Sequence, residues 1–306
     1  MILYVNRLRD KLDTYLEANN IDREINLYYT SYFEIVQPPV HKDAQGNYVA
    51  NAPELVLKDG VGVLFAPIHA NFTKSIYDKE NETTYEQLKS LRAISDRILV
   101  WTYSCNFMDF MAPFDSITNM PDWFSAIVDN GGVFLFNEGR RGQGHSSGFD
   151  VVRQYLVAKL EWDVDVDVDA LTEQFFEGYF GKAKEPMRQF YNELRVQMRK
   201  NHDENGMPSY ILSKNTNSKA CWPESLLNKW MGLINEAYEL AGDDEELRIR
   251  ILLESIFVRY YLIKLYKSND ANVETLKAEV IADAKAVGII TASAHRTVDQ
   301  MFDPEP

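Results

Sequence analysis

Four short apolar runs, evenly spaced along the first half of the sequence, constrain the fold more than any other feature. They are Ile25 to Thr30, Val61 to Ala66, Arg97 to Tyr103 and Val133 to Asn137. Their centres, at positions 27, 63, 99 and 135, lie 36 residues apart, close to the length of one strand–crossover–strand unit. Because the runs are β-branched, aromatic and almost continuously apolar, they predict parallel strands covered on both faces.

Helical patterns separate most of these runs, as an α/β fold requires. Apolar residues at helical spacing predict helices over Leu3 to Glu17, Tyr85 to Ser95 and Met120 to Asp129. The connection from Ser31 to Gly60 differs, because it holds three prolines and no convincing helix. Long connections of this kind are usually functional.

After residue 148 the strand patterns stop and amphipathic helices follow. They are predicted over Phe149 to Leu160, Asp169 to Phe180, Glu185 to Lys200, Pro223 to Leu240, Glu245 to Tyr266 and Val273 to Val287. Asp169 is expected to cap the second of them. The chain therefore divides into a partial (β/α) barrel, residues 1–148, and an α-helical domain, residues 149–306.

The number of strands is the main difficulty for this fold. A closed barrel of parallel strands needs about eight, and four leave two apolar edges with unpaired backbone groups. Helices could wrap these edges, a second copy could pair with them, or the chain could be the C-terminal part of a longer protein. The opening helix favours the last option, so we expect the C-terminal half of a TIM-type (β/α)8 barrel followed by a helical domain.

Charge and composition exclude several classes of partner. The 32 basic and 46 acidic residues give a net charge of −14, which repels nucleic acid. We find no run of about 18 apolar residues that could span a membrane, and the N-terminus alternates charge too early for a signal peptide. Cys105 and Cys221 are too few and too far apart for a disulfide framework. Neither a metal site nor a cofactor is predicted.

Side chains at the carboxyl ends of parallel strands are the candidate site, because such folds place their sites there. Trp101 and Tyr103 share one face of their strand. Aromatic rings can cover the apolar face of a sugar, and polar groups can bond its hydroxyls. The predicted substrate-binding residues are Tyr29, His69, Trp101, Tyr103, Asn106, Asn137 and Arg140, and the predicted partner is a carbohydrate.

Glu138 is the candidate catalytic residue. It directly follows an apolar strand, where partial burial would suit a general acid. Glycoside hydrolysis normally needs two carboxyl groups, and Glu34 and Asp109 are weaker candidates for the second. The alternative is that Glu138 forms a structural ion pair with Arg140 or Arg141. His69 could likewise be a structural histidine.

Two other motifs lack a residue that their chemistry requires. The glycine-rich stretch from Gly139 to Ser146 resembles a phosphate-binding loop but has His145 in the place of the lysine. The acidic run from Asp163 to Asp169 has Val168 where a calcium loop needs glycine. The first is interpreted as a flexible loop and the second as a helix start.

Several stretches of the sequence resemble one known family. They are Tyr155 to Asp163, Asp167 to Leu171, and Phe175 to Gly181 with Pro186 and Tyr191. They are similar to the barrel-to-helix junction of bacterial glycosidase-like proteins of domain of unknown function 4838, which includes glycoside hydrolase family 163. Shorter pieces of likeness are Tyr4 to Leu8, Tyr29-Thr30, Trp101 to Phe107, Pro113-Phe114 and Gly131 to Gly139, so that it spans about residues 4 to 195.

The resemblance implies a (β/α)8 barrel that acts on glycans, in family 163 as an endo-β-N-acetylglucosaminidase on N-glycans. It also implies a secreted, periplasmic or cell-surface bacterial protein. A missing half-barrel would then supply at least one catalytic carboxyl group. The favoured expectation is a glycoside hydrolase-like fragment of a longer enzyme. The alternative is a non-catalytic carbohydrate-binding or interaction remnant whose open sheet edges self-associate.

Overall fold

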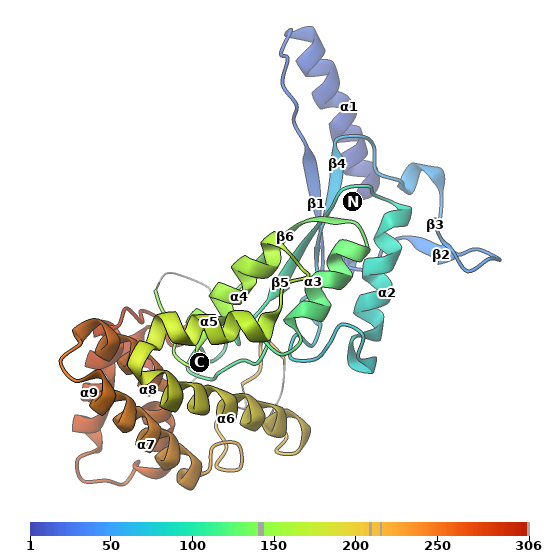
Figure 1. The fold of residues 1–306 in the computed structure, drawn as a ribbon. Helices are drawn as coiled ribbons and strands as arrows, with labels where there is room; N and C mark the ends of the chain where they lie inside the picture. The colour runs from blue at the N-terminus through green and yellow to red at the C-terminus, as the bar shows by residue number, and fades with distance from the viewer. Residues whose placement is uncertain (140–143, 208–209, 215, 305–306) are drawn as a thin grey trace. The chain divides into compact units, whose positions relative to one another are not determined.

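The computed structural model in Figure 1 describes residues 1–139, 144–207, 210–214 and 216–304. Its contacts define two compact units. The sheet unit contains residues 1–103 and 119–138, and the helical unit contains residues 104–118 and 139–306. The segment 104–118, which the linear division of the sequence assigns to the barrel, therefore groups with the helices.

The sheet unit is built on four parallel strands, as the apolar runs predict. They are β1 (Leu27–Tyr32), β4 (Val61–Ala66), β5 (Ile98–Tyr103) and β6 (Gly132–Glu138), in the order β1-β4-β5-β6. The predicted bounds of β4 are confirmed, whereas β1 lies two residues further along the chain than predicted. The fold is mixed α/β, with β1 and β6 at the two edges of the sheet.

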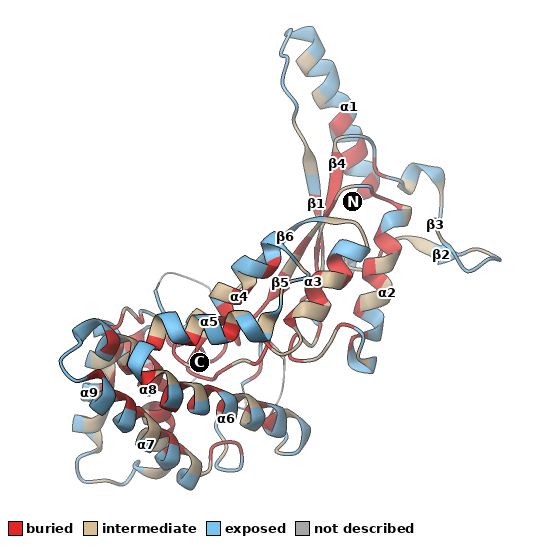
Figure 2. Ribbon diagram, viewed as in Figure 1, coloured by how far each residue is buried: buried red, intermediate tan, exposed pale blue. Residues whose placement is uncertain are grey.

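The two faces of this sheet differ in burial. Tyr29, Val63 and Val100 lie on one face, which we call the buried face, and each is less than 10% exposed. The other face, which we call the open face, carries Tyr28 and Phe136, which are 39% and 42% exposed. Figure 2 shows β4 largely buried and β6 not. The prediction that both faces are covered is therefore wrong, because the edge strands leave apolar side chains on the open face.

Three α-helices belong to the sheet unit. They are α1 (Ile2–Ala18), α2 (Glu82–Ser90) and α3 (Met120–Asp129). Helix α1 buries Ile2 and Val5 and packs against β1 and β4. Helix α3 packs against β6 so closely that a Cβ atom at Gly132 would overlap Ile127. Glycine is therefore needed at the start of β6.

The proline-rich connection between β1 and β4 contains a small antiparallel hairpin. Its strands are β2 (Val40–Lys42) and β3 (Tyr48–Ala50). The Asp43 carboxylate accepts backbone N–H bonds from Gln45 at 2.9 Å and Asn47 at 2.8 Å, which closes the turn. The described connection has no α-helix, as predicted, but its hairpin was not predicted.

The described part of the helical unit contains six α-helices. They are α4 (Asp150–Trp162), α5 (Val168–Phe180), α6 (Lys184–Asp203), α7 (Glu224–Ala241), α8 (Glu245–Tyr266) and α9 (Val273–Ala286). Each packs on the next along the chain. Aromatic rings fill the core: Phe257 of α8 lies 5.7 Å from Phe190 of α6 and 6.1 Å from Trp230 of α7. The sequence predicts all six helices to within a few residues at each end.

One predicted helix cap is wrong. The Asp167 side chain, not that of Asp169, accepts the backbone N–H of Ala170 at 2.9 Å and caps α5. Aspartate and valine alternate here, so the pattern offers several possible caps, and the helix begins at the earlier one. Asp169 instead lies in the first turn, where its charge favours the helix dipole.

The described helices include none that is both long and apolar enough to cross a lipid bilayer.

Candidate functional site

The open face of the sheet brings Trp101, Tyr103 and Glu138 together at the carboxyl ends of β5 and β6. Tyr103 pairs with Glu138 in the strand register. The Trp101 indole Nε1 donates a hydrogen bond to Glu138 Oε2 at 3.0 Å. The rings of Trp101 and Tyr103 lie 6.4 Å apart with an interplanar angle of 32°. Three of the predicted site residues therefore lie on one face of the sheet, although Tyr103 is only 5% exposed.

Phe136 also belongs to this surface, although it was not predicted. It pairs with Trp101 in the register, and their rings meet edge to face at 4.7 Å. The signal was present in the sequence, because Phe136 lies two residues before Glu138 and a strand alternates its side chains.

A second aromatic group lies where β1 and β4 end. Phe33 follows β1 with a φ of +46°, a conformation that is uncommon for a bulky residue. Its ring lies 5.5 Å from the exposed ring of His69, edge to face. Backbone strain of this kind often occurs at binding sites. His69 therefore lies at the carboxyl end of the sheet, as predicted, and Phe33 was missed.

The loop after β4 is held rigidly beside Tyr103. Phe72 contacts the Tyr103 ring at 5.7 Å and the Trp123 ring at 4.6 Å. The Trp123 indole Nε1 donates to the Lys74 carbonyl at 3.0 Å, and Asn119 donates to the Thr73 carbonyl at 2.6 Å. This loop is therefore preorganised by bonds from α3 and from the residue before it.

Two predicted residues lie on the buried face instead. Tyr29 is in the middle of β1, 7% exposed, and burial raises its pKa to about 12. The reason is that β1 continues to Tyr32, whereas the sequence predicts an end at Thr30. Asn137 donates from Nδ2 to Thr102 Oγ1 at 2.9 Å, also on the buried face. Neither residue shares the surface of Trp101.

The other predicted residues are not placed on the sheet unit. Asn106 belongs to the helical unit, where its Nδ2 donates to the Ser213 carbonyl at 2.9 Å and its Oδ1 accepts the Met108 N–H at 3.0 Å. It is buried, and these bonds fix the loop that carries it. Arg140, with its alternative pairing to Glu138, lies outside the described residues, as do residues 141–143 of the glycine-rich stretch.

The Asp109 carboxylate is hydrogen-bonded to other residues of the helical unit and is not part of the open face. Its Oδ2 accepts hydrogen bonds from Thr216 Oγ1 at 2.7 Å and the Tyr261 hydroxyl at 3.3 Å. Its Oδ1 accepts the Met111 N–H at 3.0 Å. The side chain is buried in the helical unit, so it serves as an anchor between segments of that unit.

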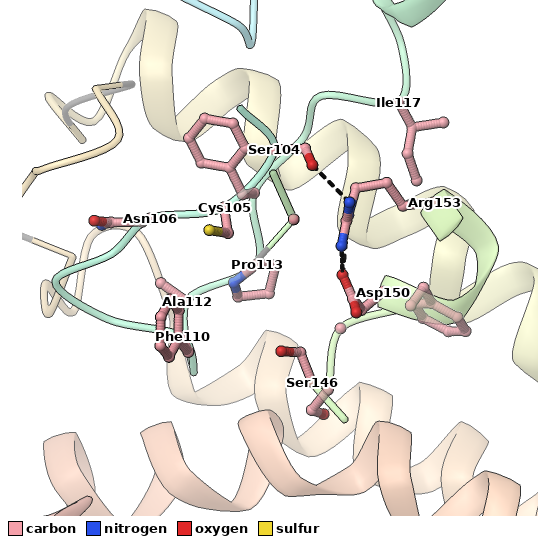
Figure 3. Close-up of a pocket in the computed structure, with 15 residues that line it drawn as sticks. Ser104, Cys105, Asn106, Phe110, Ala112, Pro113, Ile117, Ser146, Asp150 and Arg153 are labelled. Atoms are coloured by element: carbon pink, nitrogen blue, oxygen red, sulfur yellow. Dashed lines mark hydrogen bonds and ion pairs between the residues drawn. The ribbon is translucent and has the colours of Figure 1, made fainter. Parts of the chain in front are cut away.

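The helical unit has a small polar cavity of about 30 Å³, shown in Figure 3. Arg153 donates to Ser104 Oγ at 2.5 Å and pairs with Asp150, and all three line the cavity. The thiol-bearing Cys105 lies beside them. This volume holds about one water molecule and is too small for a sugar. The cavity is therefore not a candidate substrate site.

Metal binding finds no support in the geometry of the described residues. No group of three or more histidine, cysteine, aspartate or glutamate side chains among them could hold an ion. Cys105 and Cys221 are both buried thiols in the helical unit.

The open face thus offers flat rings beside a half-buried carboxylate. Rings suit the apolar face of a pyranose, and a carboxylate accepts hydrogen bonds from hydroxyl groups. This combination can bind an uncharged polar ring such as a sugar.

The fold defines the chain as a mixed α/β protein with a four-stranded parallel sheet and a separate helical unit. Residues 47–192 match the family described as domain of unknown function (DUF4838). The expected resemblance to domain of unknown function 4838 is confirmed for these residues, which include Trp101, Tyr103 and Glu138. No curated protein and no solved structure matches the chain.

Proposed function

We propose that the open face of the sheet binds carbohydrate and that the chain is a glycoside hydrolase-like protein acting on, or binding, N-acetylglucosamine-containing glycans. The observation that carries this proposal is the contact between the half-buried Trp101 indole and Glu138 on the open face of the sheet. Phe136, which is 42% exposed, extends that face beside Trp101, and the 5% exposed Tyr103 packs 6.4 Å from the Trp101 ring. The match to a domain of unknown function names no activity, so the chemistry of the surface is the support.

The sheet is proposed to be half of a (β/α)8 barrel. Its four strands are parallel, and its edge strands β1 and β6 expose Tyr28 and Phe134, which are 39% and 55% exposed. In a closed barrel such residues would face the interior and be covered by the remaining strands. Those strands would come from a further segment of a longer chain or from self-association through the open edges.

Glu138 is proposed as one of the two carboxyl groups of a hydrolase. It lies at the carboxyl end of β6, where barrel enzymes place catalytic groups. Hydrolysis normally uses two carboxyl groups, and Glu138 supplies one. The alternative proposal is a non-catalytic glycan-binding domain, in which Glu138 would only accept a sugar hydroxyl.

Glycan affinity measured by calorimetry tests the binding proposal. A GlcNAc-containing N-glycan oligosaccharide should bind the chain, and Trp101→Ala should abolish binding because it removes the ring and the bond to Glu138. Trp162→Ala is the matched control, because Trp162 is 92% exposed on the helical unit. Loss of binding in the Trp162 variant alone would move the glycan site to the helical unit and contradict the proposal.

Turnover separates the two forms of the proposal. We expect the 306-residue chain to bind the glycan without cleaving it, and a chain extended by the missing strand units to release product. Glu138→Gln in the extended chain should then remove activity. Full activity of that variant would remove Glu138 from the mechanism, and cleavage by the 306-residue chain would contradict the half-barrel proposal.

A further inference from the structure

The indole N–H of Trp101 donates its hydrogen bond to another side chain of the protein. An indole has one N–H group and no acceptor, so it can make one conventional hydrogen bond. That bond goes from Nε1 to Glu138 Oε2 at 3.0 Å. A sugar bound on this face would therefore meet the Trp101 ring and not its N–H.

The ring that carries this N–H is itself held in place. Phe136 meets the indole at 4.7 Å with an interplanar angle of 75°, and Tyr103 lies at 6.4 Å on the same strand. Trp101 and Phe136 are paired in the register of β5 and β6. The direction of the N–H is thus set by the sheet, and a fixed donor can fix the carboxylate that accepts from it.

We propose that Trp101 is a positioning residue for Glu138: its N–H helps to hold the Glu138 carboxylate in one orientation, while its ring supplies a surface for the sugar. The inference rests on the proposed function and deepens it, because it gives the two parts of one side chain separate roles. The ring and the N–H can be separated experimentally, since phenylalanine keeps an aromatic ring and lacks the donor.

The affinity prediction compares three variants. Trp101→Phe should weaken glycan binding about 10- to 100-fold, the range expected when a hydrogen bond to a charged group is lost. Glu138→Leu should weaken it at least as much, and the double variant should bind like Glu138→Leu alone, because Trp101 acts through Glu138. Trp162→Phe is the matched control and should bind like the parent chain. Circular dichroism would verify that each variant is folded.

A spectroscopic signature tests the contact without any ligand. The chain has five tryptophans, and the indole N–H resonance missing from Trp101→Phe in an ¹⁵N spectrum identifies Trp101. Glu138→Leu should move that resonance strongly, and Glu138→Gln, which keeps an acceptor oxygen, should move it less. The Trp222 and Trp230 resonances, from the core of the helical unit, should stay in place.

The outcomes are distinguishable. If the Trp101 indole resonance does not shift in Glu138→Leu, the positioning role is overturned. It is also overturned if glycan binding requires Glu138 but the affinity of Trp101→Phe is unchanged. A resonance that moves as expected in a protein that binds no glycan would overturn the proposed function and the positioning role with it. Coupled losses of affinity together with the resonance shift would support both.

Discussion

The aromatic core of the helical unit and the open face of the sheet differ in how far their rings are buried. In the helical unit Phe190, Trp230 and Phe257 are fully buried against one another. In the sheet unit Phe134 and Phe136 are about half exposed on the open face. Both units have strongly apolar sequence, so composition alone does not separate a core ring from a surface ring.

The difference separates a closed aromatic core from an accessible aromatic face. Burial of aromatic side chains is a large contribution to the stability of a core, and the helical unit uses its rings for this purpose. The open face of the sheet leaves Phe134 and Phe136 accessible, which is costly unless something covers or binds them. This contrast is the physical basis for assigning the ligand surface to the sheet.

The largest expected effect is on the core of the helical unit. Phe257→Ala should lower the free energy of unfolding by about 3–5 kcal/mol, because it removes a ring that is stacked on Phe190 and packed against Trp230. Phe134→Ala, the same change at a 55% exposed position, should cost under about 1 kcal/mol. Urea denaturation measures the free energy of unfolding of both variants. Equal losses of stability would contradict the difference in burial between the two rings.

A buried acid provides the next test of the closed core. Glu254 is fully buried, its Oε2 accepts the Phe149 N–H at 2.6 Å, and burial raises its pKa from 4.5 to about 8. The folded protein keeps a proton that the unfolded chain has lost, so this group destabilises the fold progressively as pH rises from about 4.5 to about 8. The free energy of unfolding should fall by roughly a few kcal/mol over this pH range and then level off.

Glu254→Gln should remove this part of the pH dependence, because the amide does not titrate. Stability measured across that pH range in the parent chain and the variant isolates the contribution of Glu254 from that of the other acids. Parallel curves for the two proteins would show that Glu254 titrates normally and that the core is open to water.

Asp109 tests whether the polar anchor of the helical unit matters. Asp109→Asn replaces a carboxylate oxygen that accepts bonds from Thr216 and Tyr261, and should cost about 2 kcal/mol. Asp96→Asn, the same change at a side chain that is 97% exposed, should stay within about 0.5 kcal/mol. Chemical denaturation would compare them, and a neutral Asp109 variant would count against a structural anchor.

The smallest effect concerns the cap of α5. Asp167→Ala should destabilise the protein by about 1 kcal/mol, because it removes the acceptor for the Ala170 N–H. Asp169→Ala should cost only a few tenths of a kcal/mol, from the loss of a charge in the first turn. A larger loss of stability in Asp169→Ala than in Asp167→Ala, measured by thermal or urea unfolding, would indicate that Asp169 is the cap.

Regular elements could be predicted because their patterns are local. The bounds of β4, α3 and α8 are those that the sequence indicates. The start of β1 was misplaced because aromatic and polar residues alternate there without a sharp boundary. That shift of two residues moved the strand end past Tyr29, so a predicted surface residue lies within the strand on the buried face.

The candidate site was predictable only where the strand register controls it. Trp101, Tyr103 and Glu138 follow from alternation along adjacent strands, and they meet as expected. Asn106 depends on a bond to Ser213, which is 107 residues away in the sequence, so no local pattern could reveal its structural role. The left-handed backbone at Phe33 likewise has no sequence signal, since glycine is absent there.

The proposed carbohydrate surface is tested most directly by locating where a glycan contacts the chain. In an ¹⁵N spectrum of the chain titrated with a GlcNAc-containing N-glycan oligosaccharide, we predict that the Trp101 indole resonance shifts progressively while those of Trp162 and Trp222 stay fixed. A titration in which Trp162 alone moves, or in which no tryptophan responds at saturating glycan, would contradict the claim that the open face of the sheet is a carbohydrate surface.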